Sequence, residues 1–329
     1  MSLLCAQIFP SKDNIPMDTG SLANPVQRAV FLMNSLWPVG YNIKIYFFPD
    51  KITNWEDTPI GIDSSFLDPL YETLQGKTDC VTLVKTVVKE RIEPNVKLTF
   101  TFVDNINDSD IRIKFAIDQG CHSLVGDIRE ATDYFGKPTM VFSWLDVSTV
   151  IHEFGHVLGM IHEHQNPFGN PIQWNREAVY CYYGKINKWT NEQVENNVLA
   201  PYNTDQVNGS DFDLASVMIY SFPKTIKCNG QEMYVTLDKM QINPNFKLSN
   251  NDTHWLKTMY PSSGQRDLNL IGRQPKKIIP TEIYTPVKNI VDLFGLYMKQ
   301  NTKIVIIFLS GVAIITVLYF ILKTFKIIK

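Results

Sequence analysis

The segment that most constrains this chain of 329 residues is VIHEFGHVLGMIHEHQNP, which occupies residues 150–167. His152 and His156 are four residues apart in a stretch with helical periodicity. That spacing puts both imidazoles on one face of a helix, one turn apart. Two ring nitrogens placed in this way can reach a single metal ion. The segment therefore predicts a helix that carries two ligands of a zinc site.

A third ligand is expected from His162, which follows His156 by six residues. This is too far for the two side chains to share a face if the helix simply continued. Gly159 stands between them, and glycine adopts positive φ at little cost, so it can end the helix and turn the chain back beneath the metal. We therefore predict that His152, His156 and His162 bind one Zn²⁺ ion per chain.

Glu153 follows the first of these histidines, where its carboxylate can reach a water molecule on the metal without binding the metal itself. Zinc lowers the pKa of such a water to roughly 7, and a nearby carboxylate takes its proton during attack on a carbonyl. Two alternatives stay open: a binding or decoy protein with a structural zinc, and a zinc hydrolase of esters or glycans. Structural sites usually have four protein ligands, so three histidines and a well-placed glutamate favour an enzyme.

Downstream, the segment DFDLASVMIYSFP contains Met218 and, two residues later, Tyr220. Together with the histidine segment it resembles the metzincin metalloproteases, in which a tight turn that carries a methionine lies beneath the zinc site. The resemblance implies that Met218 forms an apolar floor under the ligands. It also implies that Tyr220 can bind the zinc and swing out to stabilise the oxyanion.

Within that clan the chain is most similar to the astacin-type proteases, and especially to the bacterial and fungal ones. The similar segments, in the same order, are LWPVGYNIKIYF, DIRIKF, TMVFSWLDVSTVIHEFGH, HEHQNPFGNPIQWN and KLSNNDTHWLKTMYP, so the resemblance covers about residues 35–262. It implies an α+β fold of the metzincin-type zincin class, with a twisted mixed sheet, an active-site helix and an irregular lower subdomain. The implied activity is that of a zinc-dependent endopeptidase, which hydrolyses protein or peptide substrates.

The residues after the third histidine differ from those of the animal astacins. Glu163 is present, but HQNP at residues 164–167 replaces their Arg/Asp-rich continuation, and this leaves the role of Glu163 open. We expect an extended substrate to pair with an edge strand around Ser123–Val125. Three further histidines lack metal-ligand spacing and are expected to be solvated or locally hydrogen-bonded: His122, His164 and His254.

Hydrophobic periodicity predicts the elements around the site. Helices are expected at residues 26–36, 79–91, 148–158 (capped by Ser148), 191–199 and 248–260. Strands are expected at residues 41–48, 96–103, 111–115 and 139–144, with a short extended piece at 123–126. The rest of the chain between Gly159 and about residue 250 is expected to be irregular.

The C-terminus carries a signal of another kind. Ile304–Leu322 reads IVIIFLSGVAIITVLYFIL, which contains no charge and is long enough to span a bilayer as a helix. We therefore predict single-pass attachment to a membrane. The predicted domains are a leader (1–34), an astacin-like catalytic domain (35–262), a juxtamembrane linker (263–303), the transmembrane helix (304–322) and a basic tail (323–329).

The membrane side of the catalytic domain stays open. The lysine-rich tail favours a cytoplasmic C-terminus with the bulk of the chain outside. No secretory signal is expected at the N-terminus, which favours a cytosolic bulk instead. Five cysteines fit either up to two disulfides or five reduced thiols: Cys5, Cys80, Cys121, Cys181 and Cys228. A formal net charge of −2, without any run of Lys or Arg, argues against a nucleic-acid partner.

Overall fold

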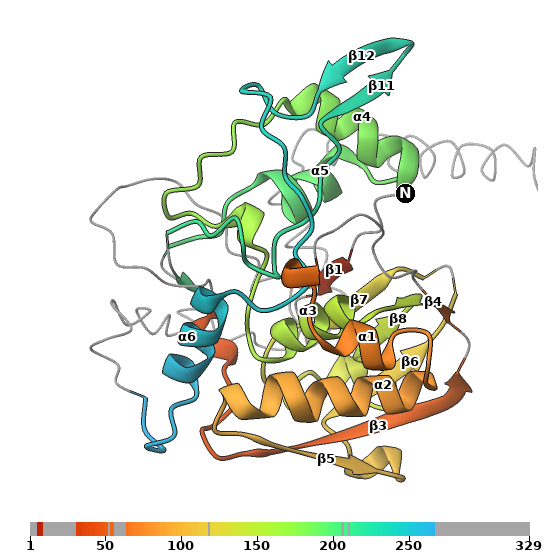
Figure 1. Cartoon of the computed structure of the whole chain (residues 1–329), viewed down its shortest axis with the longest axis vertical. Coiled ribbons are helices and arrows are strands. Elements are labelled where there is room, and N and C mark those ends of the chain that lie inside the picture. The colour runs from red at the N-terminus through yellow and green to blue at the C-terminus, as the bar shows by residue number, and fades with distance from the viewer. Residues whose placement is uncertain are drawn as a thin grey trace, which may run out of the picture. The chain divides into compact units, whose positions relative to one another are not determined.

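A six-stranded mixed sheet underlies the metal-ligand helix in the computed structural model, which describes residues 5–8, 31–51, 53–55, 64–117, 119–204, 207–209 and 211–266. The strand order is β1-β7-β8-β6-β3-β5 (Figure 1). The strands are β1 (Cys5–Ile8), β3 (Asn42–Lys51), β5 (Thr99–Val103), β6 (Ile111–Phe115), β7 (Cys121–Leu124) and β8 (Met140–Phe142). The pair β7–β8 is antiparallel, and the other neighbouring pairs are parallel.

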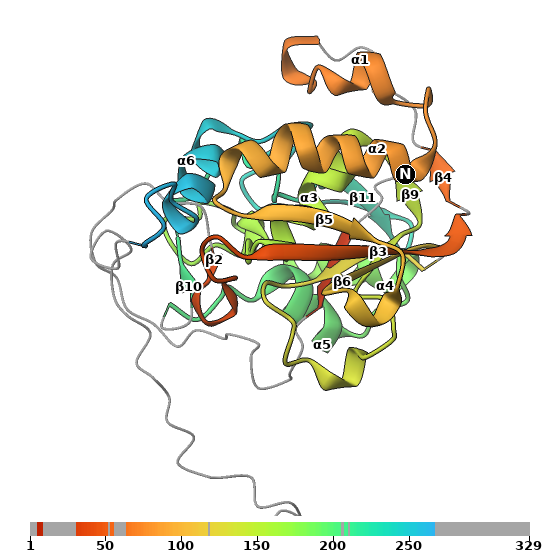
Figure 2. The ribbon, with the colours of Figure 1, turned by 90° about the horizontal axis from the view of Figure 1, so that it is seen from below.

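Two helices lie on one face of this sheet, α2 (Cys80–Val87) and α3 (Val147–Val157) (Figure 2). Ile43 and Ile45 of β3 are buried on that face, and Lys44 between them is exposed, as strand alternation requires. Phe154 of α3 packs edge-on against Phe100 of β5, with ring centroids 6.2 Å apart. A helix of this length is marginal in water by itself, so packing on the sheet is what keeps α3 folded.

The start of α3 corrects one sequence-based expectation. The cap is Asp146 and not Ser148, so the helix begins at Val147. The Asp146 carboxylate accepts the Thr149 amide at 2.8 Å, and the Ser148 hydroxyl donates to the same carboxylate at 2.6 Å. Aspartate reaches the third amide of the helix, which is the usual bond of an N-cap side chain.

The prediction of a helix at residues 26–36 was wrong where the structure describes it, and residues 26–30 lie outside the described ranges. Instead, β2 (Phe31–Leu32) is followed by the 3-10 turn η2 (Met33–Ser35). The strand pairs with β10 (Val207–Asn208), and the Leu32 amide donates to Gly159 O at 2.8 Å. Pairing with distant residues has overridden the local helical pattern.

Most other predicted elements of the sheet half (residues 31–161) are confirmed with shifted ends. The helix at 79–91 is α2, capped by Asp79 and continued by the π-turn η4 (Val88–Ile92). The strand at 139–144 is split into β8 and β9 (Trp144–Leu145), which pairs with β4 (Asn54–Trp55). The remaining short elements of this half are η3 (Ser64–Phe66), α1 (Leu70–Leu74), η5 (Glu93–Asn95), η6 (Ile106–Asp108) and η7 (Thr132–Tyr134).

The irregular half (residues 162–250) contains more regular structure than expected. The helix predicted at 191–199 is confirmed as α5 (Asn191–Val194) and the π-turn η9 (Glu195–Leu199). The elements that the sequence did not predict are η8 (Glu163–Gln165), α4 (Arg176–Ile186), β10 (Val207–Asn208), β11 (Thr225–Cys228) and β12 (Gln231–Tyr234). A disulfide between Cys181 and Cys228 joins α4 to the β11–β12 hairpin, and this pairing was open at the sequence level.

The helix predicted at 248–260 is confirmed as α6 (Asn250–Met259), capped by Ser249. Within the described ranges, no helix has the length and apolar character needed to cross a membrane. The predicted transmembrane helix Ile304–Leu322 and the basic tail at 323–329 lie outside those ranges, as do most of the leader and nearly all of the linker.

Candidate metal centre

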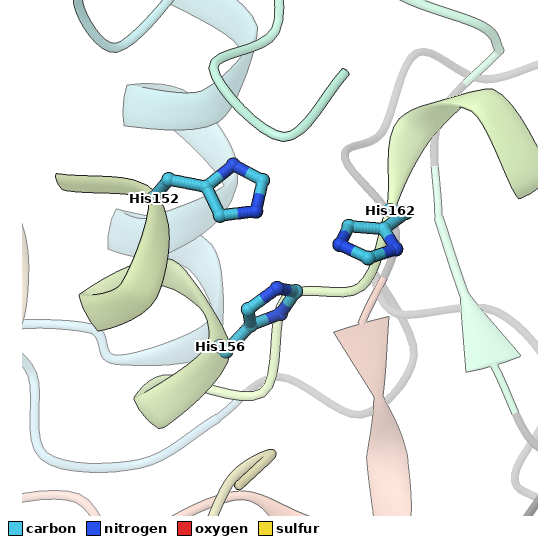
Figure 3. A group of neighbouring side chains, drawn as sticks. All are labelled: His152, His156 and His162. Atoms are coloured by element: carbon cyan, nitrogen blue, oxygen red, sulfur yellow. The ribbon is translucent and has the colours of Figure 1, made fainter. Parts of the chain in front are cut away.

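His152, His156 and His162 come together as the spacing predicted (Figure 3). The first two project from α3, and the third projects from the chain after it has turned back, so that all three rings point into one space. One nitrogen from each ring lies within 4.8 Å of the corresponding nitrogen of the other two, and all three residues are buried. Elements of both halves of the domain therefore build the group.

Gly159 makes the turn between the second and third histidine. Its φ is +89°, in the region that glycine alone adopts easily, and its amide donates to His156 O at 2.8 Å. A Cβ at this position would also lie 2.7 Å from Leu36 Cδ2. The backbone conformation therefore requires glycine here, whereas the close approach involves only the movable end of the Leu36 side chain.

The last carbonyls of α3 accept hydrogen bonds from three segments that are far apart in the chain. The donors to residues 156, 157 and 158 are the Gly126 amide at 2.8 Å, the Trp37 indole at 2.7 Å and the Tyr260 hydroxyl at 2.8 Å. Arg266 donates to Trp37 O, and its guanidinium lies over the Tyr260 ring at 5.1 Å. The C-terminal end of the metal-ligand helix is thus closed without relying on water.

In each of the two helical histidines, one ring nitrogen bonds to a backbone carbonyl and the other makes no hydrogen bond within the described residues. Nδ1 of His152 lies 2.9 Å from Val217 O, and Nδ1 of His156 lies 2.9 Å from Met160 O. A carbonyl accepts, so Nδ1 must carry the proton in both rings and Nε2 must present its lone pair. Neither Nε2 atom has a hydrogen-bond partner among the described residues. This is the arrangement of a histidine that binds a metal through Nε2.

Burial keeps these three imidazoles neutral. It lowers the pKa of His152 to about 4 and holds the pKa values of His156 and His162 well below the ordinary 6.5. Neutral imidazole is the form that binds zinc, so the donor set fits this ion. Among the described residues, no fourth His, Cys, Asp or Glu joins the group. Three protein ligands leave one coordination position for water or substrate, as catalytic zinc sites do.

Glu153 and the turn that carries Met218 lie next to this group. Glu153 follows His152 on α3 and is fully buried. Met218 packs directly against the helix, because a Cβ added to Gly155 would lie 2.5 Å from its Sδ. Sequence reasoning missed Gly155, although a glycine in the middle of a helix costs about 1 kcal/mol and usually marks a close approach of this kind.

Tyr220 reaches the histidines from the irregular half. Its ring centroid is 4.2 Å from that of His162, and the planes make an angle of 53°. Asp252 supports the turn that precedes Tyr220. Its carboxylate accepts hydrogen bonds from the Ser216 hydroxyl at 2.8 Å and from the Val217 amide at 3.0 Å. Burial raises the pKa of Asp252 to about 6. The sequence signal for Asp252 was its place three residues after the cap Ser249.

Glu163, whose role the sequence left open, is bonded within the protein. Its Oε1 atom accepts the Asn166 side-chain amide at 2.8 Å and the Asp213 backbone amide at 2.8 Å. Burial raises its pKa well above the ordinary range. Glu163 therefore ties the segment that carries the third ligand to the segment that leads into the Met218 turn.

The other histidines divide as follows. His254 is exposed and His122 is half-buried, whereas His164 is buried and its Nε2 lies 3.2 Å from Asn197 O. Solvation of His164 is wrong because its side chain is buried, and its hydrogen bond is to a residue 33 positions further along the chain, not to a near neighbour in sequence. His164 lies beside the metal group although its spacing does not suggest it.

The strand expected to receive a substrate is already paired on both sides. Residues 121–124 form β7, with β8 on one side and β1 on the other. β1 runs parallel to β7, with Gln7 opposite Ser123. An extended peptide can therefore take this edge only after β1 has left it.

The sequence profile of the peptidase family described as Astacin matches residues 81–261. The structure of myroilysin is similar, with 30% identity and a TM-score of 0.52, over 70% of this chain and 98% of that chain. A crystal structure of myroilysin shows 25% identity and a TM-score of 0.45, over 79% and 91% of the two chains. High choriolytic enzyme 1 of the medaka fish Oryzias latipes, a hatching-enzyme zinc-protease, shows 13% identity and a TM-score of 0.41, over 72% and 98%. No curated protein sequence matches this chain.

Proposed function

Because the chain belongs to the astacin family and is therefore a zinc metalloendopeptidase, we propose that Glu153 is its general base and that Tyr220 stabilises the oxyanion. The observation that carries this proposal is the division of the ring nitrogens. Nδ1 of His152 and Nδ1 of His156 bond to carbonyls, which leaves both Nε2 atoms for the metal next to the buried carboxylate of Glu153.

The proposed reaction is hydrolysis of a peptide bond. When bound, zinc supplies Lewis acidity, which polarises a carbonyl and lowers the pKa of water. Glu153 takes a proton from the attacking water and passes it to the leaving amine. Glu153 lies one residue after His152 on α3, so the helix holds its carboxylate beside the metal ligands. The ion itself is bound by histidines.

Tyr220 is assigned to the oxygen of the reacting carbonyl. Its ring lies 4.2 Å from the ring of His162 and 6.3 Å from that of His152, centroid to centroid. A phenol in this position donates a hydrogen bond to the negative charge that develops on the carbonyl oxygen. Loss of one such donor typically costs about 10²–10³ in kcat.

The substrate would lie extended and add to the edge of β7, once β1 has left that edge. Main-chain hydrogen bonds to an edge strand give affinity for any extended peptide. This pairing would place the scissile bond beside α3, because the Gly126 amide, just past the end of β7, bonds to His156 O at 2.8 Å.

We also propose that Ile304–Leu322 anchors the enzyme to a membrane, on the basis of its 19 uncharged residues and the lysines on both sides. The Cys181–Cys228 disulfide favours a catalytic domain on the oxidising side. Protease protection of a chain tagged at both ends measures this directly. In intact vesicles whose cytosolic face points outward, digestion of the catalytic domain together with protection of the C-terminal tag would contradict that side.

Glu153→Ala tests the catalytic assignment. The variant should keep one equivalent of zinc, because the three histidines remain, and its kcat/KM on casein should fall by about 10²–10⁴, the usual contribution of a general base. Glu130→Ala is the matched control, since Glu130 is exposed and distant in sequence from the metal group. An unchanged rate in a zinc-loaded Glu153→Ala enzyme would remove Glu153 from the mechanism.

A further inference from the structure

His164 is a buried aromatic side chain beside the metal group that the proposed reaction does not use. It lies in η8, two residues after the ligand His162, and is 1% exposed. Its ring is stacked with that of His162 at 5.1 Å between centroids, at an angle of 24°. The ring therefore occupies the space directly behind the third ligand.

The environment of His164 fixes the plane of the ring. Nε2 bonds to Asn197 O at 3.2 Å, and the rings of Phe222 and Trp174 meet it edge-on at 5.4 Å and 6.4 Å. The Asn170 side-chain amide donates to the His164 carbonyl at 2.8 Å, which also fixes its backbone. Nδ1 has no hydrogen-bond partner among the described residues, so the single bond to Asn197 sets the orientation of the ring.

The flat face of this fixed ring carries Tyr220. The two rings are stacked with centroids 4.4 Å apart and planes 30° apart. Tyr220 also contacts His162 at 4.2 Å, but at 53°, so His164 provides the flatter of the two supports. Without the His164 ring, Tyr220 could settle into the vacated space and move its hydroxyl away from the ligands.

We propose that His164 is a positioning residue, which keeps the Tyr220 phenol where it can donate to the oxyanion. This inference rests on the role proposed for Tyr220. A stack of two rings limits the sideways freedom of the phenol more than an aliphatic contact would, because offset stacking has a preferred geometry. A displacement of about 1 Å at a catalytic group is enough to lower a rate substantially.

Two variants of His164 test whether Tyr220 needs the flat aromatic face of the ring or only its volume. His164→Leu keeps much of the volume but removes the flat face, and we expect kcat on a fluorogenic peptide to fall about tenfold, with KM and zinc content unchanged. His164→Phe restores the face, and kcat should fall less than about threefold. Equal losses in the two variants, or full kcat in His164→Leu, would contradict the proposal.

A double-mutant cycle with Tyr220→Phe identifies the residue through which His164 acts. In the Tyr220→Phe background, His164→Leu should cause no further loss of kcat, because the hydroxyl that it positions is already gone. Independent losses that multiply would overturn the inference and leave the role of Tyr220 intact. An unchanged kcat in Tyr220→Phe alone would overturn both.

Trp189→Leu is the matched control for lost aromatic packing in the same half. Trp189 stacks on Tyr183 at 5.2 Å and 12°, and neither residue belongs to the metal group. The substitution should lower the melting temperature and keep kcat. A fall in kcat that matches that of His164→Leu would show that general loosening of the irregular half explains both effects and would overturn the inference.

Discussion

In the sheet half, parallel strands and two helices bury one face of alternating apolar side chains, such as Ile43, Ile45 and Phe100. In the irregular half, side chains bond instead to backbone groups far along the chain. Gln165, for example, donates to Asn196 O at 2.9 Å and to Ala200 O at 2.8 Å. Regular alternation of buried side chains organises the first half, whereas the second combines such long-range bonds with irregularly spaced core residues such as Val179, Val194 and Val198.

The metal centre takes its parts from both halves. The helix α3 supplies two histidines and Glu153, and the irregular half supplies His162, Met218 and Tyr220. The comparison teaches that a loop-rich segment can place a ligand as firmly as a helix when each of its bonds is specific. It follows that damage to the irregular half should affect metal and catalysis before it affects the sheet.

His162→Ala should have the largest effect, because it removes the only ligand that the irregular half provides among the described residues. We expect zinc affinity to fall by more than about 100-fold, the upper range for loss of an outer-shell partner alone. Competition with a chelator of known affinity measures the fall. Far-ultraviolet circular dichroism should stay close to that of the parent, because α3 and the sheet keep their packing.

One tightly bound zinc in the His162→Ala variant would contradict the claim that both halves supply essential ligands. It would mean that α3 and some other residue suffice as ligands, and that the irregular half contributes no essential donor.

Removal of the disulfide by Cys181→Ser together with Cys228→Ser should have the next largest effect. The sequence separation is 47 residues. The loop-entropy model then predicts a loss of about 3–4 kcal/mol in the free energy of unfolding. Hydrogen exchange should accelerate in α4 and the β11–β12 hairpin, while the strands β3 and β6 keep their protection. Equal acceleration in both halves would show that they unfold as one cooperative unit.

Gly155→Ala probes the contact between the halves and should have the smallest effect. The new Cβ would lie 2.5 Å from Met218 Sδ, so the methionine must shift. We expect a loss of about 1–3 kcal/mol, as for other overpacked cores, measured by denaturant unfolding. When Gly155→Ala is combined with Met218→Ala, the loss should be smaller than the sum of the two single losses, because the shortened side chain no longer meets the new Cβ. If Gly155→Ala alone is as stable as the parent, the turn that carries Met218 can move aside without loss of stability.

Features set by residues close together in the sequence could be predicted. The three histidines and Gly159 lie within eleven residues of one another, so spacing and the conformational freedom of glycine were enough to assemble them. The strand at 111–115 was also predicted correctly, since its bounds depend on local alternation of apolar side chains.

Features set by distant partners could not be predicted in this way. Phe31–Leu32 is a strand because it pairs with Val207–Asn208, which no local window contains. The helix α4 reads REAVYCYYGKI, whose aromatic and charged residues lack a clean apolar stripe. Disulfide pairing among several cysteines is likewise not deducible from sequence alone.

The contacts that close the end of α3 are complete by Arg266, which bonds to Trp37 O and covers the ring of Tyr260. A cut anywhere between Arg266 and the predicted anchor at residues 304–322 would leave every one of these contacts in place. The described contacts of the metal centre would therefore survive release of the domain. With the proposed anchor removed, the protease would diffuse with the same active site and meet a far wider choice of substrates.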